Sequence, residues 1–260
     1  MNKLSTIRDS LDFQILRMGE TVVPEQGTCV PVKEGLIHVW SARYSILDHY
    51  QPLLSAQISP DEMLKAEGFK KPGDVRRYIL RRGMVRTILG HYIREDPEKL
   101  RFIQGMTGKP DLDPDGKFSN IRFSISRTDE MACLVITKKS GIGVDIVKSQ
   151  TRSSFSAIGH YLFTPGERRW VAQTGSDRRP LRFFRIWALK EALLKAMGGD
   201  VRIMKEADVS HIMTDDFLDG FYTVNLWEKD QKCFIHESGC GADHHRVLAA
   251  TPEITRESYN

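Results

Sequence analysis

The order of apolar and polar residues predicts strands along much of the chain. Strict alternation, typical of a half-buried strand, occurs at residues 37–43 and at 121–126, where it places Phe123 and Ile125 inward and Ser124 and Ser126 outward. A continuous apolar run at 132–137 indicates a strand that is buried on both faces. Three further strands are expected near the end of the chain, at 221–227, 232–236 and 246–250.

Helix-start residues mark several helices between these strands. Ser59-Pro60-Asp61-Glu62 predicts a short helix that ends near Gly68, and Thr164-Pro165-Gly166-Glu167 predicts another with Glu167 at the capping-box position. Asp74 is expected to cap a helix running from Val75 to about Arg94. Residues 153–162 are also expected to be helical.

The strongest helix signal covers residues 185–199. The segment has no internal Gly or Pro before Gly198-Gly199, and one face is apolar, formed by Ile186, Leu189, Leu193, Ala196 and Met197. At about 100° per residue, Glu191 and Lys195 share nearly the opposite face. They form either a solvated surface pair or a functional pair. Trp187 lies one turn before Glu191 on the same stripe and favours the functional interpretation, because a solvent-facing stripe rarely carries an indole.

The strand expected at 142–147 contains an unusual acid. Ile142, Val144 and Ile146 point to one side of it, and Gly143, Asp145 and Val147 point to the other. A carboxylate in an apolar strand is costly to bury unless it is hydrogen-bonded or bound to a cation. Asp145 therefore either faces water at a sheet edge or binds a metal ion.

Composition is that of an ordinary globular protein. The 260 residues are 40% hydrophobic and 28% charged, and they suffice for one large domain or two of about 130 residues. No apolar run is long enough to span a membrane, and the first residues lack the apolar core of a signal peptide, so we expect a cytoplasmic protein. The four cysteines are scattered without a Cys-x-x-Cys pair, which argues against structural zinc and disulfides.

Positive charge is concentrated in one short region. The net charge is only +4, but seven basic residues gather there: Lys70, Lys71, Arg76, Arg77, Arg81, Arg82 and Arg86. This cluster indicates an anionic partner for one site. A solvated face with snorkelling side chains is an alternative, and so is a nucleic-acid patch. Against the latter, the run is short, and Tyr78 is the lone aromatic candidate for stacking on bases.

Two motifs together resemble a known family. Trp187, Lys190, Glu191, Ala192 and Lys195 form Trp-x-x-Lys-Glu-Ala-x-x-Lys, and Gly143-Val144-Asp145-Ile146 precedes them. In order and spacing they resemble the signature of 4'-phosphopantetheinyl transferases of the larger, surfactin-synthetase-activating type. The resemblance runs from about His38 to Ala250.

The resemblance implies an α+β fold of two similar α/β halves in a pseudo-two-fold arrangement. Mostly antiparallel sheets would pack with helices, and the active site would lie in the cleft between the halves. We therefore expect an irregular N-terminal arm over residues 1–34, an N-terminal half over 35–141 and a C-terminal half over 142–260 that carries the metal acids.

The implied reaction moves the 4'-phosphopantetheine arm of coenzyme A, the co-substrate, to a serine of an acyl or peptidyl carrier protein. It releases 3',5'-adenosine bisphosphate and would serve fatty-acid, polyketide or nonribosomal-peptide biosynthesis. Asp145 and Glu191 would bind Mg²⁺, Glu191 would accept the serine proton directly or through water, and Lys195 would contact the phosphates. We expect a monomer that binds neither membrane nor nucleic acid.

The family also suggests residues that bind the coenzyme. The basic segment contributes Arg77 and Lys71, the Gly108-Lys109-Pro110 triplet contributes Lys109, and the central helix contributes Lys190. Ser126 and Arg127 complete the set, and Glu167, in a Phe163-x-x-x-Glu167 segment, is a possible neighbour of the site.

Two departures from the family pattern matter. Ser126-Arg127-Thr128 stands where members usually have Ser-His-Ser, and an arginine can still contact phosphate with stronger charge. Val147 replaces a second acid that many bacterial members place two residues after the strand Asp, so water must fill that ligand position. A catalytically weak homologue that only binds coenzyme A or a carrier protein therefore stays an alternative, as does a nucleic-acid-binding module.

Overall fold

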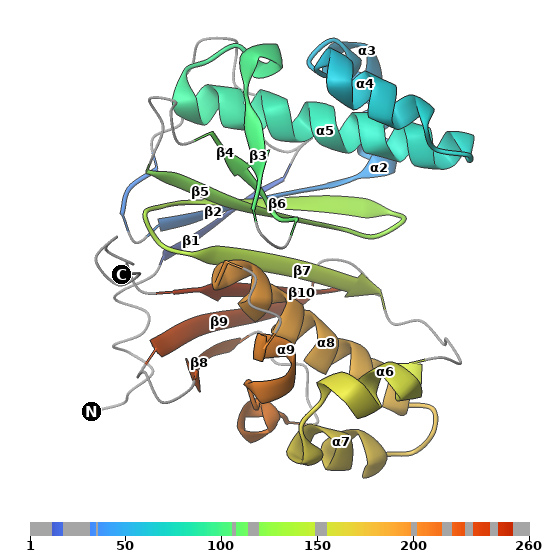
Figure 1. Cartoon of the computed structure of the whole chain (residues 1–260), viewed down its shortest axis with the longest axis vertical. Helices are drawn as coiled ribbons and strands as arrows, with labels where there is room; N and C mark the ends of the chain where they lie inside the picture. Colours follow the sequence, from blue (N-terminus) through green and yellow to red (C-terminus); the bar gives the residue numbers. More distant parts are fainter. Residues whose placement is uncertain are drawn as a thin grey trace.

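The computed structural model describes most of the chain (Figure 1). The described residues are 12–17, 32–34, 36–105, 108–113, 120–148, 155–198, 202–214, 220–226, 231–239 and 244–251. Most of the expected N-terminal arm, residues 1–34, lies outside these ranges, as do the ends of several predicted loops and strands.

The first sheet has four strands in the order β1-β2-β6-β5. They are β1 (Asp12–Arg17), β2 (Leu36–Arg43), β6 (Met131–Lys138) and β5 (Ile121–Arg127). β2, β5 and β6 were predicted and pair antiparallel, whereas β1 pairs parallel with β2. The expectation of an irregular arm is therefore wrong at residues 12–17, which gain strand structure by pairing with a segment distant in sequence.

Helices cover the outer face of this sheet (Figure 1). They are α2 (Tyr44–Leu47), α3 (Gln51–Ser55), α4 (Pro60–Glu67) and α5 (Pro72–Ile93), with 3₁₀ helices at Asp48–Tyr50 and Pro97–Lys99. A small hairpin of β3 (Phe102–Gln104) and β4 (Pro110–Leu112) follows. The predicted capping box of α4 is present at Ser59 and Glu62. Helix α5 begins earlier than predicted, because Lys71 is the N-cap and Pro72 is the first helical residue. Asp74 therefore lies inside the first turn and does not cap the helix.

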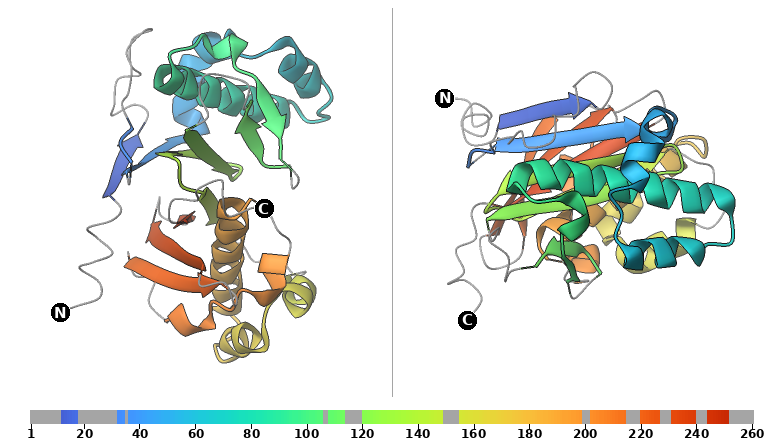
Figure 2. Two further views of the ribbon diagram at one scale, coloured as in Figure 1. Left: turned by 60° about the vertical axis from the view of Figure 1, so that its left-hand side comes forward. Right: turned by 90° about the horizontal axis from the view of Figure 1, so that it is seen from above.

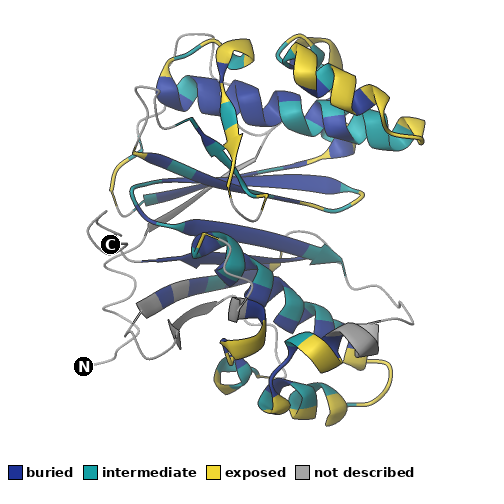
Figure 3. Ribbon diagram, in the orientation of Figure 1, coloured by how far each residue is buried: buried dark blue, intermediate teal, exposed yellow. Residues whose placement is uncertain are grey.

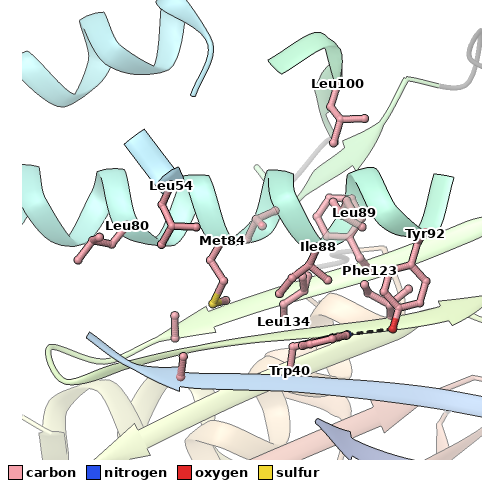
Figure 4. Packing of buried hydrophobic residues seen from close by; sticks show 14 of the residues in the cluster. Trp40, Leu54, Leu80, Met84, Ile88, Leu89, Tyr92, Leu100, Phe123 and Leu134 are labelled. Carbon is pink, nitrogen blue, oxygen red and sulfur yellow. Dashed lines mark hydrogen bonds between the residues drawn. The ribbon is translucent and has the colours of Figure 1, made fainter. Parts of the chain in front are cut away.

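The first core forms where α5 packs on the sheet (Figure 4). Met84 and Ile88 of the helix pack with Trp40 and Leu134 of the strands, and each of these side chains is almost completely buried. Such burial contributes roughly 1.5–3 kcal/mol for each large apolar side chain. Tyr92 adds a polar link, since its hydroxyl accepts a hydrogen bond of 2.9 Å from the Trp40 indole.

The second sheet is antiparallel throughout, in the order β7-β10-β9-β8. Its strands are β7 (Ile142–Lys148), β10 (His244–Ala250), β9 (Gln231–Gly239) and β8 (Gly220–Leu226). The accompanying helices are α6 (Phe155–Leu162), α7 (Pro165–Ala172), α8 (Arg179–Ala196) and α9 (Arg202–Glu206), with a 3₁₀ helix at Ser210–Ile212. The long helix α8 contains most of the segment predicted at 185–199 and packs along β7 and β10 (Figure 2).

The two sheets also pack against each other. Residues of β2 and β6 meet residues of β7 and β10 in a cluster consisting of Ile37, Val39, Met131, Cys133, Val135, Ile142, Val144, Ile146, Leu248 and Ala250. The order of layers is thus α5, first sheet, second sheet, α8, and the central strands are mostly buried (Figure 3). This mixture of helices with mostly antiparallel sheets confirms the α+β prediction.

Within the described ranges, no helix is long and apolar enough to cross a membrane.

Candidate active site

A large cavity is lined by residues of both sheets and of their helices. Its volume is about 1850 Å³, and its walls come from α5, the β3–β4 hairpin, β5, β7 and α8. Most small-molecule sites occupy roughly 300–1,000 Å³, so this one has room for an extended ligand. Asp145, Glu191 and Lys195 lie together on its wall.

Asp145 lies on β7 with only 8% of its surface exposed. Its Oδ1 accepts a hydrogen bond of 2.8 Å from the Ser126 hydroxyl and another of 2.8 Å from the Lys195 ammonium. A carboxylate buried to this extent is stable only with such partners. β7 is the edge strand of its sheet, but the alternative of a water-facing Asp is wrong, because β5 lies against β7 on the side that does not pair with β10.

Ser126 and Ser124 tie β5 to β7. The Ser126 hydroxyl accepts from the Ile146 amide at 3.1 Å, and the Ser124 hydroxyl accepts from the Val144 amide at 3.2 Å. The sequence placed both serines outward, in water, but both are buried. The alternation correctly predicted which face of β5 carries the two serines. It could not show that β7 of the second sheet covers this face.

Lys195 and Glu191 face the cavity from α8. The Lys195 ammonium donates to Asp145 and also to the Val144 carbonyl at 2.9 Å, so it joins the helix to β7. Burial raises the pKa of Glu191, the Asp145 charge raises it further, and Lys195 opposes both effects. The solvated-pair interpretation is wrong for Lys195, whose cation is held by another strand.

The acids of this site suit a magnesium ion. No group of three or more His, Cys, Asp or Glu gathers anywhere in the described residues, so a metal cage made by protein alone is absent there. Mg²⁺ commonly needs one or two carboxylates, with water and substrate phosphate completing its shell. Asp145 and Glu191 fit that requirement, since both line the cavity and their charges repel each other. Val147, the residue without a carboxylate, lines the same cavity.

Lys190 does not belong to this site. It is completely buried, and its ammonium lies 2.9 Å from a carboxylate oxygen of Glu167, which is also completely buried. The same ammonium donates to the carbonyls of Met204 at 3.0 Å and Ala207 at 2.8 Å. Burial raises the pKa of Glu167 and lowers that of Lys190, and each partner opposes the other's shift. The prediction that Lys190 binds the coenzyme is thus wrong, and its role is structural. Glu191, the next residue, faces the cavity, whereas Lys190 points away from it toward Glu167.

Lys109 reaches the site from the β3–β4 hairpin. Its ammonium donates to the carbonyls of Ile142 and Lys195, both at 2.7 Å. Burial lowers the pKa of Lys109 to about 8, against the opposing charge of Asp111. Lys109 lines the cavity as the sequence suggested, and in this structure it fastens the hairpin to β7 and to the end of α8.

The basic segment is largely paired. Arg77 lines the cavity and lies 2.6 Å from Asp74 and 3.9 Å from Asp129. Arg76 pairs with Asp48, and Glu62 takes both Arg82 and Arg86. Lys71 is exposed at the start of α5 and lies outside the cavity wall, so the structure does not bring it to the site. The free, solvated arginine face considered above is therefore wrong.

Several residues of the cavity were missed or misread from the sequence. Arg127 lines it as predicted, and so does Arg81 of the predicted basic cluster, whereas Tyr44 carried no recognisable signal. An apolar stretch of the wall near Glu191 consists of Val147, Phe184, Trp187 and Leu194. His244 and His245 are buried at the start of β10, where His245 contacts Glu237 at 2.7 Å.

Comparison with known proteins finds one family whose model matches part of the chain. Residues 141–250 match the model of the 4'-phosphopantetheinyl transferase superfamily. This match contains β7 with Asp145 and α8 with Glu191 and Lys195.

Named relatives extend the similarity over more of the chain. The 4'-phosphopantetheinyl transferase HetI of Nostoc sp. is 27% identical over 69% of this chain and 76% of its own length. The phosphopantetheinyl transferase of Thraustochytrium sp. is 26% identical over 84% and 83%. The L-aminoadipate-semialdehyde dehydrogenase-phosphopantetheinyl transferase of Homo sapiens is 27% identical over 88% and 79%. The family match and these relatives agree, so both comparisons show that this chain is similar to 4'-phosphopantetheinyl transferases.

Proposed function

We propose that this protein transfers the 4'-phosphopantetheine arm of coenzyme A to a serine hydroxyl of an acyl or peptidyl carrier protein. The observation that carries the proposal is the cluster of Asp145, Glu191 and Lys195 on the wall of a coenzyme-sized cavity, within the segment that matches the family. The identity of the transferred group, phosphopantetheine, comes from the names of the relatives.

In the proposed reaction the serine oxygen attacks the phosphorus that bears the pantetheine arm. A new bond forms between serine oxygen and phosphorus, and the bond from that phosphorus to the bridging oxygen breaks. The bridging oxygen leaves on 3',5'-adenosine bisphosphate. Phosphoryl transfer of this kind depends mainly on positioning and charge stabilisation, so few protein groups are needed.

Glu191 is the group proposed to take the serine proton. Burial raises the pKa of its carboxyl, which makes it a stronger base than an exposed glutamate. It lies on the cavity wall beside the apolar residues Trp187 and Leu194, which restrict water around it. A bound water between Glu191 and the serine would serve the same transfer.

Lys195 and Ser126 are proposed to fix the second acid. Both donate a hydrogen bond to Oδ1 of Asp145 and so fix the orientation of its carboxylate. The other oxygen, Oδ2, is then available to a ligand. Asp145 and Glu191 are the residues that would hold Mg²⁺, and the bound ion would supply neutralisation of the pyrophosphate charge.

The basic residues of the cavity would then bind the remaining phosphates of coenzyme A. Arg77 and Arg127 both line the wall, and Lys109 lies between the hairpin and the end of α8. We propose that Arg77 exchanges its carboxylate partners, which are partly exposed, for phosphate oxygens when the coenzyme binds.

The finer expectations remain proposals as well. We propose the larger, surfactin-synthetase-activating subtype, a cytoplasmic location, a monomer, and no binding of nucleic acid. The last of these is supported by the pairing of most α5 arginines with carboxylates, which removes the free positive charge that duplex binding requires.

The direct test is intact-mass spectrometry of purified acyl and peptidyl carrier proteins after incubation with the protein, coenzyme A and Mg²⁺. We expect each accepted carrier to gain the mass of one phosphopantetheine group. A carrier with its acceptor serine changed to alanine should gain nothing. Carriers that stay unmodified here, but are modified by a known transferase, would contradict the proposal.

A further inference from the structure

The β3–β4 hairpin extends from the end of α5 toward the second sheet (Figure 1). Its base is held by α5, because the guanidinium groups of Arg82 and Arg86 lie 4.6 Å and 5.1 Å from the centroid of the Phe102 ring. Phe102 also packs edge-on against Phe123 of β5. Just before β3, the Leu100 carbonyl accepts a hydrogen bond of 3.1 Å from Arg86. The base of the hairpin is therefore fixed to the first sheet and its long helix.

Lys109 links the hairpin to the second sheet and its helix. It directly precedes β4, and its ammonium donates hydrogen bonds of 2.7 Å to the carbonyls of Ile142 and Lys195. Ile142 is the first residue of β7, and Lys195 lies in the last turn of α8. One side chain of the hairpin thus holds two elements that belong to the other sheet.

The Lys195 carbonyl is a favourable partner for a cation. The last four carbonyls of a helix have no amide partner within the helix, and the C-terminus of a helix carries a partial negative charge. Lys195 is the last residue but one of α8, so its carbonyl is one of these four. The Lys109 ammonium satisfies it with a charged donor. Lys109 therefore caps α8 from a distant part of the chain.

This cap lies where α8 and β7 are in close contact. A Cβ built at Gly141 would lie 2.4 Å from the carbonyl oxygen of Ala196, so the backbones of the two elements touch there. Asp145 follows the strand carbonyl that Lys109 holds by three residues, and Glu191 precedes the helix carbonyl by one turn. A shift of either element at this point would move an acid of the cavity.

We infer that Lys109 is a positioning residue for the proposed transfer, and that it acts through these two carbonyls and not as a ligand of the coenzyme. By joining the hairpin to β7 and α8, it fixes the acids of the second sheet relative to the cavity walls formed by α5 and β5. The inference rests on the proposed function, because the reaction that Lys109 would serve is that transfer. It replaces the contact between Lys109 and the coenzyme that the sequence suggested.

Steady-state kinetics of carrier modification, combined with calorimetric titration with coenzyme A, tests the inference in the intact protein. Lys109→Met removes both hydrogen bonds and keeps a side chain of similar length. We expect kcat to fall about tenfold or more, because small displacements of reacting groups are costly, while the Kd for coenzyme A changes by less than about twofold. Lys109→Arg retains a charged donor and should recover most of the turnover.

Lys139→Met is the matched control, because Lys139 lies between β6 and β7, pairs with Glu34 and does not line the cavity. It should leave kcat and the Kd for coenzyme A unchanged, since an exposed ion pair contributes little. Melting curves identify any variant that does not fold. Lys109→Gln, which keeps two N–H donors, is the milder change if Lys109→Met does not fold.

Hydrogen exchange followed by mass spectrometry reports on the two elements without the reaction. Lys109→Met should speed the exchange of amides in β7 and in the last turn of α8, and Lys139→Met should not. Unchanged exchange in Lys109→Met would overturn the inference.

The outcomes separate this inference from the proposed function. A lower kcat at unchanged coenzyme A affinity, together with faster exchange, supports the positioning role. Weaker coenzyme A binding at unchanged kcat would make Lys109 a ligand and overturn the inference. If the wild type modifies no carrier protein, the proposed function fails, whereas faster exchange at unchanged coenzyme A affinity would still support the hold of Lys109 on both elements.

Discussion

At the scale of single residues, Asp145 shows how a carboxylate is kept in a buried strand. Ser126 and Lys195 both donate to its Oδ1, and one comes from the other sheet while the other comes from α8. The alternation of β7 predicted the face of Asp145 but not its partners. Those partners are 19 and 50 residues away in sequence, and only the fold brings them to the acid.

Glu191 should make stability depend on pH in a defined direction. Burial raises its pKa in the folded protein above the ordinary value of 4.5. The folded state therefore binds more protons than the unfolded state above that value, and this stabilising contribution is lost as pH rises through the raised pKa.

We expect the stability of the wild type to fall relative to Glu191→Gln as pH rises from about 4.5 toward neutrality. Urea unfolding of both proteins across this window measures the difference in unfolding free energy. Other carboxylates, such as Glu237 with its lowered pKa, make the stability of both proteins depend on pH. Only the difference in unfolding free energy between the two proteins reports on Glu191. A difference that does not vary with pH would show that Glu191 is not buried as described.

Substitution of Val147 tests the effect of the acid that is missing two residues after Asp145. It lies two residues after Asp145 and lines the cavity, so Val147→Glu would add a carboxylate to the same face. The variant should reach half-maximal transfer at a lower Mg²⁺ concentration, and it should melt at a lower temperature in chelator, where the new acid is unpaired.

Activity measured against Mg²⁺ concentration, with melting temperatures in chelator and in Mg²⁺, provides the check. An unchanged metal requirement together with a lower melting temperature in both conditions would place residue 147 in the core instead. In that case Val147 would no longer be a reason to regard this protein as a catalytically weak homologue.

At the scale of elements, the contact between β7 and α8 sets the geometry of the acids. Gly143 allows this contact, since a Cβ built there would lie 1.9 Å from the Ala192 carbonyl oxygen and 2.7 Å from the Ala196 amide nitrogen. A glycine is therefore required at position 143, because the backbones of β7 and α8 approach each other closely there. The part of α8 at this contact also carries Glu191 and Lys195.

Gly143→Ala should therefore destabilise the protein by at least about 1–3 kcal/mol, the usual cost of overpacking. It should also reduce transfer beyond the loss expected from unfolding, because α8 must move away from Asp145. Gly239→Ala is the matched control on β9, where an added Cβ meets nothing within 4 Å. Wild-type stability and activity in Gly143→Ala would show that the helix does not lie this close to the strand.

Lys190 and Glu167 hold the helices of the second half together. Through Lys190, α8 is linked to the Glu167 carboxylate of α7 and to carbonyls at Met204 and Ala207 around α9. Removing one member of a buried ion pair leaves an uncompensated charge, which typically costs about 3–5 kcal/mol.

We expect Lys190→Met to lower the melting temperature strongly and to leave the affinity of the folded protein for coenzyme A unchanged. Lys205→Met, an exposed position on α9, is the control and should have little effect. The double variant Lys190→Met with Glu167→Gln should regain part of the lost stability. A weaker coenzyme A affinity in a stable Lys190→Met would return Lys190 to the site.

Elements were easier to predict than their surroundings. Strands β2, β5, β6 and β7 and helices α4, α7 and α8 follow from periodicity and caps, which are local properties of the chain. β1 was missed because its strand depends on pairing with β2. The burial of Ser124, Ser126 and Lys190 was missed for the same reason, since each is covered by an element from another part of the sequence.

At the scale of the whole molecule, the cavity depends on both sheets. Asp145, Glu191 and Lys195 come from the second sheet and its helix, whereas Tyr44, Arg81 and Arg127 come from the first sheet and its helices. The apolar contact between the sheets, together with the two serine hydroxyls of β5, keeps these groups in register. The division of the chain at residues 34 and 141 stays a prediction.

The function proposed for this cavity is transfer of phosphopantetheine, with Glu191 and Asp145 as its acids. The most direct measurement is the rate at which a carrier protein gains the group, followed by intact mass, for the wild type and for Glu191→Gln at matched folded concentration. We predict that the wild type modifies the carrier and that Glu191→Gln loses most of this activity while it still binds coenzyme A. Near-wild-type turnover by a stably folded Glu191→Gln would exclude Glu191 from the groups that catalyse the transfer.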